Sequence, residues 1–298
     1  MNGIARRLHK AWLLKKIEGG IAMGQVVVIT GCADGMGRHV AKMLAAAGHS
    51  LAGFDVDSKG ITSLVKELKE IGGDHLLEVI DITDRPAIRK FSDQVLAHYG
   101  HVDTVLSNVG IGFFSPFEEV NLEKALKCLE INVIGAAAIF QAFIPSMRKR
   151  RSGKLIAMSS LVGRIPFPFE SIYSASKFAI TGMVLSLKYE VAPFGIQVAL
   201  IEPAQVSTTF AAKIHVLPPE NSVYRDRARR FIERDDELIK TAPTPPYAAK
   251  KIMKVIETKN PSLFNQIDFM SSFFLWLNQI LPRWMRDAIL VNHMHIKV

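Results

Sequence analysis

The chain has 298 residues, of which 49% are hydrophobic and 22% charged, and this composition excludes an intrinsically disordered protein. Much of its formal net charge of +9 lies near the ends, in Arg6–Lys16 and at Arg283 and Arg286; it favours an anionic membrane surface over nucleic acid, because no nucleic-acid-binding motif is visible. Only two cysteines, Cys32 and Cys128, are present, so at most one disulfide can form, which fits a reducing cytoplasm.

Residues 1–23 are basic and precede the first strand-like run. We expect them to form either an amphipathic arm or a solvated tail. Their apolar block, Ala11–Leu14, ends at two lysines, so a secretory signal is not expected. A transmembrane helix is not expected either, because the longest uncharged apolar stretch, Phe269–Pro282, is shorter than the ~20 residues that a bilayer requires.

From Gln25 onwards, apolar strand-like runs alternate with helix-like runs. This alternation predicts a parallel sheet covered by helices on both faces, a Rossmann-type doubly wound fold that binds ligands at the carboxyl ends of its strands. The expected strands are Gln25–Ile29, Ser50–Phe54, Leu76–Ile80, Val102–Leu106, Lys154–Met158, Ile196–Ile201 and a short seventh at Leu263–Ile267. The expected helices are Gly37–Ala47, Lys59–Ile71, Arg85–His98, Leu122–Met147, Tyr173–Ala192, Asn221–Leu238 and Tyr247–Thr258.

This pattern divides the chain into a basic arm over residues 1–23, a catalytic domain over 24–268 and an apolar helical extension over 269–298. Within the domain, Asn221–Leu238 is dense in charged residues, so we expect an exposed helix inserted before the last strand.

The first strand leads into a glycine-rich loop, Thr30–Gly37, that opens a helix. Glycine lets a bound group approach the backbone, and a helix N-terminus offers free N–H groups and partial positive charge to a phosphate. The spacing, G-x-x-x-G-x-G, differs from the standard dinucleotide fingerprint and also fits an ordinary tight turn. With the rest of the pattern it predicts a dinucleotide site. The expected contacts are Gly31, Asp34, Gly35, Met36 and Gly37.

The end of the second strand indicates which dinucleotide is bound. Asp55 can accept hydrogen bonds from a ribose diol, and Asp34 adds negative charge nearby. A 2′-phosphate at ~4 Å from one carboxylate would cost on the order of 4 kcal/mol at an effective dielectric of 20, before solvent reduces it. No Arg or Lys compensates at Val56 or in the loop, so NAD is expected over NADP. Asp81 and Ile82, after the third strand, are expected beside the adenine.

A tyrosine and a lysine four residues apart, Tyr173 and Lys177, lie on one helix face. A free tyrosine has a pKa of about 10, and a nearby cation lowers the pKa of an acid by roughly 1–3 units. Lys177 together with a cationic nicotinamide is therefore expected to bring the pKa of Tyr173 near 7, where general acid–base catalysis is efficient. Ser160, at the end of the preceding strand, could hold a substrate oxygen beside the tyrosine.

Taken in order, these motifs resemble those of the short-chain dehydrogenase/reductase family. The matching pieces are T-G-x-x-x-G-x-G at Thr30–Gly37, Asp81, N-x-G at Asn108–Gly110, Asn132, Ser160, Y-x-x-x-K at Tyr173–Lys177 and P-x-x-V-x-T at Pro203–Thr208. The resemblance covers Gln25–Phe264. Two departures are Ser107-Asn108-Val109-Gly110 for the usual N-N-A-G and Pro203-Ala204 for the usual P-G, and neither removes a reacting group.

The resemblance implies a role for each matched residue. Tyr173 would be the acid/base, Lys177 would bind the nicotinamide ribose and lower the tyrosine pKa, and Ser160 would polarise the substrate. Asn132 would hold a water that links Lys177 to solvent. The remaining expected cofactor contacts are Asn108, Gly110, Pro203, Val206 and Thr208, the last three around the nicotinamide carboxamide.

Aromatic residues crowd the expected substrate side, at Phe113, Phe114, Phe117 and Ile165–Phe169, and they fit either core packing or a lipophilic pocket. The extension over 269–298 fits a lid, a partner surface or a membrane-facing helix, and it resembles the apolar tails of family members that act on steroids, retinoids or long-chain lipids. His293 and His295 lack clustered partners, so no metal is expected.

The leading hypothesis is an NAD-dependent oxidoreductase that interconverts a secondary alcohol and a ketone on a lipophilic substrate. The alternatives are an NADPH-dependent reductase of a long-chain lipid ketone and a non-catalytic cofactor-binding protein at the membrane periphery. Helices at Leu122–Met147 and Tyr173–Ala192 are apolar on more than one side, and with the family's usual pairing they predict a homodimer or homotetramer. The expected location is the cytoplasm, with peripheral membrane contact left open.

Overall fold

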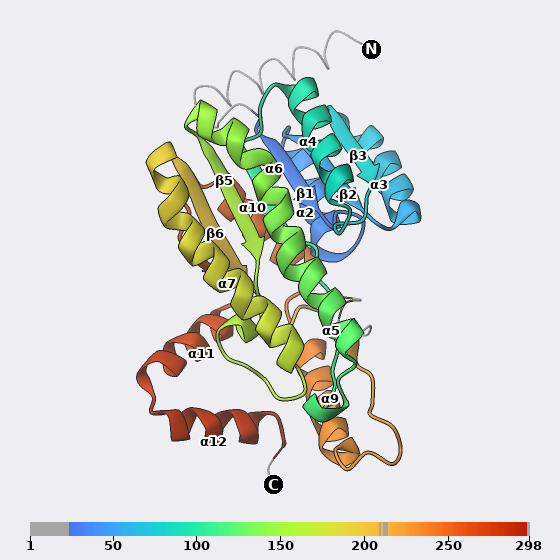
Figure 1. Ribbon diagram of the computed structural model, residues 1–298, viewed down its shortest axis with the longest axis vertical. Coiled ribbons are helices and arrows are strands. Elements are labelled where there is room, and N and C mark those ends of the chain that lie inside the picture. The colour runs from blue at the N-terminus through green and yellow to red at the C-terminus, as the bar shows by residue number, and fades with distance from the viewer. Residues whose placement is uncertain (1–23, 209, 211–213, 297–298) are drawn as a thin grey trace.

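A computed structural model describes residues 24–208, 210 and 214–296, so the expected basic arm lies outside the described residues. Seven parallel strands form one sheet in the order β3-β2-β1-β4-β5-β6-β7 (Figure 1). The order reverses between β1 and β4, so the doubly wound prediction is confirmed. The strands are β1 (Val26–Thr30), β2 (Ser50–Asp55), β3 (His75–Val79), β4 (Thr104–Ser107), β5 (Gly153–Met158), β6 (Ile196–Glu202) and β7 (Phe264–Gln266).

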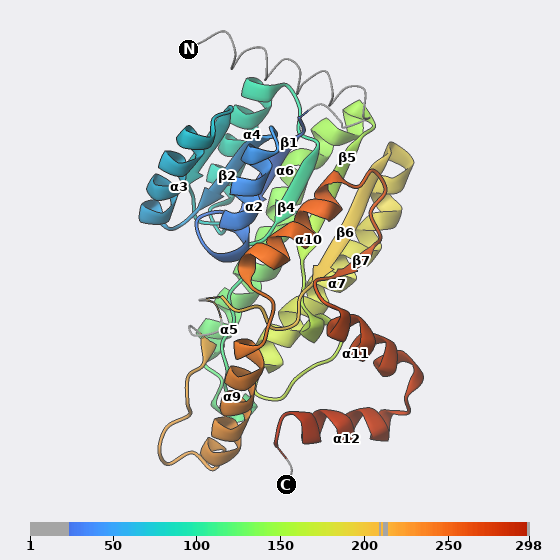
Figure 2. The same ribbon diagram turned by 180° about the vertical axis from the view of Figure 1, so that it is seen from behind.

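Helices cover both faces of this sheet (Figure 2). One face packs against α2 (Gly35–Ala46), α3 (Ser58–Ile71) and α10 (Pro245–Glu257), and the other against α4 (Arg85–Tyr99), α6 (Gly135–Arg150) and α7 (Ser171–Val191). The helix α5 (Leu122–Leu129) precedes α6 and packs against α7 beyond the carboxyl ends of the strands (Figure 1). Because β1 lies between two covered faces, all five of its residues are buried, as its uninterrupted apolar run predicts. Short 3-10 turns are η1 (Phe117–Glu119), η3 (Leu161–Gly163) and η4 (Ala192–Phe194).

The helix expected over Leu122–Met147 is interrupted by a π-helical turn, η2 (Glu130–Ile134), between α5 and α6. A π turn inserts one residue per turn and is often found at functional sites. By length and composition alone, Leu122–Arg150 could cross a membrane. Its inner side, however, includes Ile139 and Phe143, which are fully buried against the sheet, so this helix belongs to the core of the fold.

Three further helices lie beyond the carboxyl ends of the strands: α9 (Arg225–Lys240), α11 (Phe269–Ile280) and α12 (Arg283–His293) (Figure 1). The expectation that α9 is simply exposed needs correction, because Phe231 is fully buried. In addition, three of its arginines donate hydrogen bonds to backbone carbonyls at the end of the chain. The pairs are Arg227 with Ile296 (3.0 Å), Arg230 with His295 (3.3 Å) and Arg234 with His293 (3.0 Å).

Candidate active site

The glycine-rich loop turns sharply between β1 and α2. Gly31 and Gly35 have φ values of +69° and +54°, in the left-handed region that glycine adopts without strain. A Cβ atom at Gly37 would lie 2.0 Å from the carbonyl oxygen of Gly31, so no larger residue fits there. Asp34 caps α2 by accepting a hydrogen bond from the Gly35 N–H at 2.7 Å. The loop therefore brings its backbone and the α2 N-terminus within reach of a phosphate, while Met36 packs on the core.

The segment after β4 holds this loop in place. Asn108 Nδ2 donates to the carbonyl oxygens of Thr30 and Gly31 at 3.2 and 2.9 Å, and the Asn108 N–H donates to Thr30 Oγ1 at 3.1 Å. Two residues on, a Cβ at Gly110 would lie 3.3 Å from Lys177 Nζ. The N-x-G motif thus holds the glycine loop through Asn108, and the lack of a side chain at Gly110 leaves space for the nearby Lys177 ammonium.

The carboxylate of Asp55 stands directly beside the glycine loop. Its Oδ2 accepts from the Ala33 N–H at 3.0 Å, and its Oδ1 accepts from the Asp57 N–H at 3.0 Å. Farther along the edge, Asp81 is exposed and accepts from both the N–H and the Oγ1 of Thr83 at 2.9 and 2.8 Å. Ile82 is buried, so only its backbone can face a nucleotide.

A cation near Asp55 was missed by the sequence interpretation, which considered only Val56 and the loop. Arg38, one residue after the loop, donates to the Ala33 carbonyl at 2.9 Å and to Glu67 at 2.7 Å. Lys42 and Arg38 beside Glu67 hold the pKa of that carboxyl below its usual value. The Arg38 charge is therefore already paired, which reduces what it can offer to a 2′-phosphate.

Ser160, Tyr173 and Lys177 come together at the carboxyl end of β5. Ser160 Oγ donates to the Pro203 carbonyl at 3.2 Å and also has a hydrogen bond with Tyr173. Lys177 Nζ lies 5.6 Å from the centre of the Tyr173 ring and donates to the Met158 carbonyl at 2.8 Å. The arrangement places a hydroxyl, a phenol and an ammonium around one point, as general acid–base chemistry at an alcohol or carbonyl oxygen requires.

The segment from Pro203 to Thr208 adjoins this group. Besides the bond from Ser160, the Pro203 carbonyl accepts from the Leu161 N–H at 2.8 Å. Val206 is buried in the core, and its carbonyl accepts from the Thr208 N–H at 2.7 Å. The two bonds to the Pro203 carbonyl place the start of this segment beside Ser160.

Asn132 lies in the π turn and is fully buried. Its Oδ1 accepts from the Ile111 N–H at 2.8 Å, and its Nδ2 donates to the Ile111 carbonyl at 2.8 Å and to Ser176 Oγ at 2.9 Å. Because both amide atoms have partners, the side chain connects the segment after β4 to α7. The water-holding role remains a prediction, and the bonds assign the amide itself a positioning role.

Burial controls the ionisation of the two central residues in the protein alone. Burial, and secondarily the Glu170 carboxyl, raise the pKa of Tyr173 above its ordinary value, although the Ser160 hydrogen bond lowers it. Burial lowers the pKa of Lys177 to about 8. In the protein alone, removal of the phenol from water outweighs the favourable contacts that it gains. The pKa near 7 is expected with a cationic nicotinamide bound, and it stays a prediction.

Two polar features of the substrate side carry no sequence motif. Glu170 is buried at the start of α7, and burial raises the pKa of its carboxyl well above the usual range. His215 lies between Asp235 and Asp236, at 2.8 and 2.9 Å. Although burial opposes its charge, these two carboxylates raise the pKa of His215. Glu170 stands three residues before Tyr173, one helical turn away, and that spacing is the signal that could have identified it.

Both interpretations of the aromatic residues apply, at different positions. Phe114 and Phe167 are buried in an apolar cluster, whereas Phe117 is 73% exposed. A cavity of about 960 Å³ lies next to this cluster and is lined in part by Ile165–Phe167. Among the described residues, no group of three or more His, Cys, Asp or Glu side chains could hold a metal ion.

The family profile described as short chain dehydrogenase matches residues 25–216. A 3-ketodihydrosphingosine reductase of Bacteroides thetaiotaomicron is 32% identical over 242 residues, which is 80% of this chain and 85% of the relative. The human 17-beta-hydroxysteroid dehydrogenase type 1 is 32% identical over 201 residues, 65% of this chain and 61% of the relative.

Solved structures agree with the fold. A short-chain dehydrogenase from Streptomyces avermitilis superposes with a TM-score of 0.76 at 28% identity, covering 89% of this chain and 94% of that one. A dehydrogenase from Burkholderia phymatum, solved in complex with NAD, has a TM-score of 0.75 over 85% of this chain and 92% of its own, but at 23% identity it is informative on the fold alone.

Proposed function

The chain belongs to the short-chain dehydrogenase family, and from that premise we propose that it interconverts a secondary alcohol and a ketone on a lipophilic substrate with NAD(H). Family members are NAD(P)-dependent alcohol or ketone oxidoreductases, and the chain is an enzyme of this class. The observation that carries the proposal is the convergence of Ser160, Tyr173 and Lys177 beside the glycine loop. The stability of the fold alone does not require all three residues at these positions.

The residues of the loop fit a dinucleotide. A side chain at Gly37 would fill the turn, and the backbone N–H groups at the α2 N-terminus are suited to a pyrophosphate. When bound, the dinucleotide supplies the hydride acceptor or donor. Lys177 would hold the nicotinamide ribose, and Pro203, Val206 and Thr208 would lie along the carboxamide.

In this mechanism Ser160 Oγ donates a hydrogen bond to the substrate oxygen, and Tyr173 Oη transfers a proton to or from the same oxygen. The raised pKa of Tyr173 keeps the phenol protonated at neutral pH in the protein alone. A protonated phenol can donate its proton to a carbonyl oxygen in ketone reduction, and the phenolate that remains can accept a proton from an alcohol in the reverse direction.

Two side chains bear on the choice of cofactor. The Asp55 carboxylate beside the loop favours NAD, because it suits a ribose diol and repels a 2′-phosphate. Arg38 is the observation that favours the alternative, an NADPH-dependent reductase of a long-chain lipid ketone, but its pairing with Glu67 weighs against it.

A turnover assay tests the proposal. Purified protein would be given NADH or NADPH with a panel of lipid ketones, and oxidation of the cofactor would be followed spectroscopically. We expect turnover with NADH at a higher kcat/KM than with NADPH. A preference for NADPH would show that Arg38 leaves Glu67 for the phosphate, and the absence of turnover with every ketone and alcohol would favour the non-catalytic alternative.

Assembly and location complete the proposal. Leu126 and Phe178 are 68% and 44% exposed on α5 and α7, which supports a homodimer or homotetramer built on these helices. Light scattering that gives only the 33.1 kDa monomer at micromolar concentration would contradict it. We place the enzyme in the cytoplasm, in peripheral contact with a membrane through the exposed apolar side of α11.

A further inference from the structure

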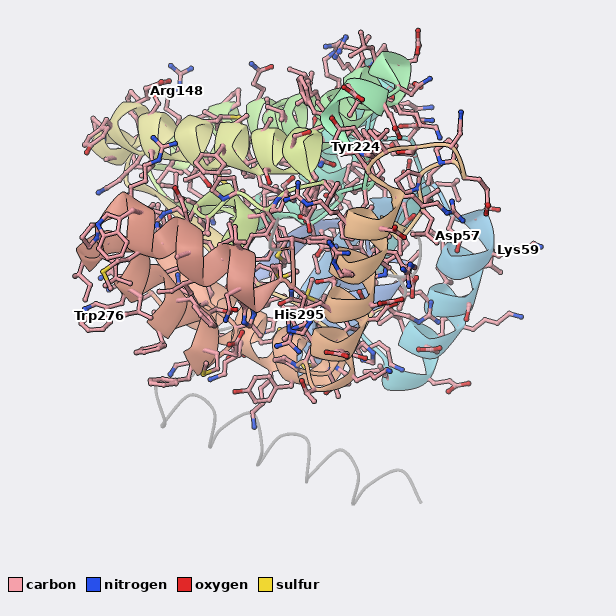
Figure 3. The ribbon with its side chains drawn as sticks, turned by 90° about the horizontal axis from the view of Figure 1, so that it is seen from below. Asp57, Lys59, Arg148, Tyr224, Trp276 and His295 are labelled. Carbon is pink, nitrogen blue, oxygen red and sulfur yellow. The ribbon has the colours of Figure 1, made fainter. Side chains whose placement is uncertain are left out.

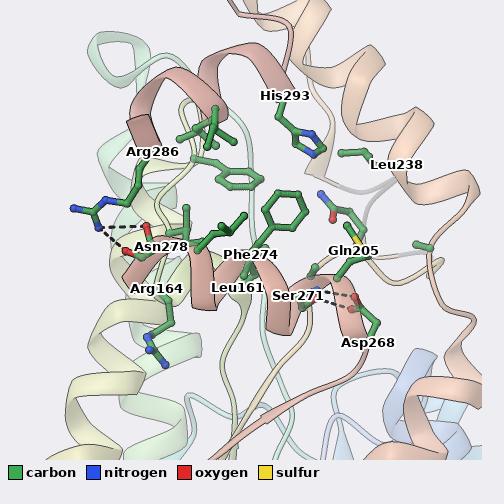
Figure 4. A pocket seen from close by; sticks show the side chains of 18 of the residues that line it. Leu161, Arg164, Gln205, Leu238, Asp268, Ser271, Phe274, Asn278, Arg286 and His293 are labelled. Atoms are coloured by element: carbon green, nitrogen blue, oxygen red, sulfur yellow. Dashed lines mark hydrogen bonds between the residues drawn. The ribbon is translucent and has the colours of Figure 1, made fainter. Parts of the chain in front are cut away.

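The helices α11 and α12 form a hairpin that encloses a cavity of about 960 Å³ against the loops after β5 and β6 (Figure 4). Most of the residues that line this C-terminal chamber lie outside the family match over residues 25–216. We propose that the chamber binds a single long aliphatic chain of the substrate. This deepens the proposed function and rests on it.

The chamber begins next to the catalytic group. Leu161, which lines it, directly follows Ser160, and Ala204 directly follows Pro203, the residue whose carbonyl accepts the Ser160 hydrogen bond. A substrate whose oxygen lies between Ser160 and Tyr173 can therefore extend its apolar part into the chamber.

The lining suits hydrocarbon. Phe274 faces the chamber from α11 (Figure 4), and Leu277 of α11 and Leu290 of α12 also line it. The His293 ring packs at a tilt of 52° against Phe274 with ring centres 5.5 Å apart, and burial lowers the pKa of that histidine, which favours its neutral form. The volume lies at the upper end of the range of about 300–1,000 Å³ for small-molecule sites.

Several polar side chains in the lining have partners within the protein, whereas Arg286 Nε is buried without one among the described residues. Asn278 Oδ1 accepts from Arg286 at 3.3 Å, and Ser271 donates to Asp268 through both its N–H at 2.8 Å and its Oγ at 2.6 Å. Because these bonds are internal, they do not require a polar ligand.

The Tyr173 ring is closely packed against Gly112 and Phe210, and we infer from this packing a preference for a slim chain over fused rings. The Phe210 ring lies 5.9 Å from the Tyr173 ring, centre to centre. A Cβ at Gly112 would lie 3.1 Å from the Tyr173 ring and 3.4 Å from Phe210. A methylene chain is the slimmest apolar group that can join the reacting carbon to the chamber.

Two tryptophan substitutions on α11 test the proposal. Leu277→Trp fills the chamber, whereas Gln279→Trp adds the same side chain at an exposed position of the same helix. Both variants would be checked for folding by thermal unfolding and for cofactor affinity by fluorescence. The readouts are kcat/KM over a series of aliphatic ketones of increasing length, and binding of a fluorescent polyene fatty acid without cofactor.

In the wild type we expect kcat/KM to rise by up to about fourfold with each added methylene until the chamber is full. Leu277→Trp should lower kcat/KM at least tenfold for long ketones, leave short ones unchanged and weaken probe binding, and Gln279→Trp should behave as the wild type. Turnover that is independent of chain length, equal effects of both variants, or a preference for fused-ring ketones would each overturn the proposal while the proposed function stands. Probe binding that Leu277→Trp abolishes, without turnover of any substrate, would support the chamber and refute the oxidoreductase.

Discussion

The two sides of the active site are held together in different ways. On the cofactor side, a few neighbouring residues determine the shape, since Gly37 must be glycine to clear the Gly31 carbonyl and Asp55 bonds directly to the loop. On the substrate side, the shape depends on segments that are far apart in the sequence, as when Arg234 of α9 binds the carbonyl of His293 at the end of α12. Because its constraints are local, the cofactor side can be recognised from a sequence motif. The substrate side depends on contacts between distant segments, so only the folded structure reveals it.

Tyr173 lies between the cofactor side and the substrate side. Replacing it with Phe removes only the hydroxyl group and leaves the ring that packs there. We expect Tyr173→Phe to lower kcat by about 10²–10⁴-fold, because a positioned proton donor contributes that much, while cofactor affinity stays nearly unchanged. Steady-state kinetics and a cofactor titration measure both. Tyr189→Phe, at a 75% exposed position on the same helix, is the matched control. Activity of Tyr173→Phe within threefold of the wild type would contradict the assigned role.

Gly37→Ala tests whether the cofactor side is as locally constrained as the contacts indicate. The added methyl would lie 2.0 Å from the Gly31 carbonyl and 2.7 Å from Asn108 Nδ2, so the loop must shift. We expect a loss of about 1–3 kcal/mol in the free energy of unfolding and at least about tenfold weaker cofactor binding. Chemical denaturation and fluorescence titration report these two effects.

Gly182→Ala serves as its control, because a Cβ at this exposed helical position meets no atom within 4 Å. It should be neutral or stabilise by up to about 1 kcal/mol. If both variants retain full cofactor affinity, the loop does not bind the dinucleotide as closely as its glycines suggest.

The sequence could predict features that depend on neighbouring residues, but not features that depend on segments far apart in the chain. Strand order, the glycine turn and the grouping of Ser160, Tyr173 and Lys177 were predictable, because parallel strands bring their carboxyl ends to one edge. The pairing of Arg38 with Glu67 was not, since it joins two helices. Nor was the raised pKa of Tyr173, because burial depends on the whole packed surrounding and a motif does not record it.

The same is true of the last part of the chain. Its apolar and charged stretches predicted helices. They could not indicate that arginines of α9 would donate hydrogen bonds to backbone carbonyls at residues 293–296. Met294 and Phe231 are both fully buried in one apolar cluster, although they are far apart in the sequence and no local pattern encodes their association.

The energetic cost of burying the Lys177 charge can be measured through the free energy of unfolding. Its pKa falls from 10.5 in water to about 8 in the fold, so below pH 8 the folded protein holds a buried charge at a cost. Lys177→Met should therefore raise the free energy of unfolding by about 1–3 kcal/mol at pH 7, after the loss of the bond to the Met158 carbonyl.

The sign is set by proton binding. Between pH 8 and 10.5 the unfolded state holds more protons at Lys177 than the folded state, so wild-type stability rises with pH and the advantage of the variant shrinks. Urea denaturation at several pH values measures this trend. If Lys177→Met is less stable than the wild type at pH 7, burial of the charged lysine does not destabilise the fold. Activity should be lost in either case.

The smallest expected effect concerns the outer side of α11, where the substrate side would meet a lipid surface. Trp276 is 54% exposed and points away from the body of the molecule (Figure 3), and Phe269 at the start of α11 and Trp284 at the start of α12 are 78% and 72% exposed. An apolar side chain at an interface contributes roughly 1.5–3 kcal/mol when fully buried, and each nearby cation, such as Arg283, adds about 1 kcal/mol over anionic lipid.

Trp276→Ser should therefore reduce co-sedimentation with anionic vesicles by about tenfold, since a half-exposed side chain gains only part of that energy. Binding of the wild type should also weaken at high salt, because the contribution of Arg283 is screened. Tyr189→Ser, at the opposite end of the sheet on α7, should bind as the wild type does. If neither protein sediments with vesicles and Trp276→Ser instead dissociates an oligomer, the outer side of α11 is an assembly surface and the substrate side has no membrane contact through it.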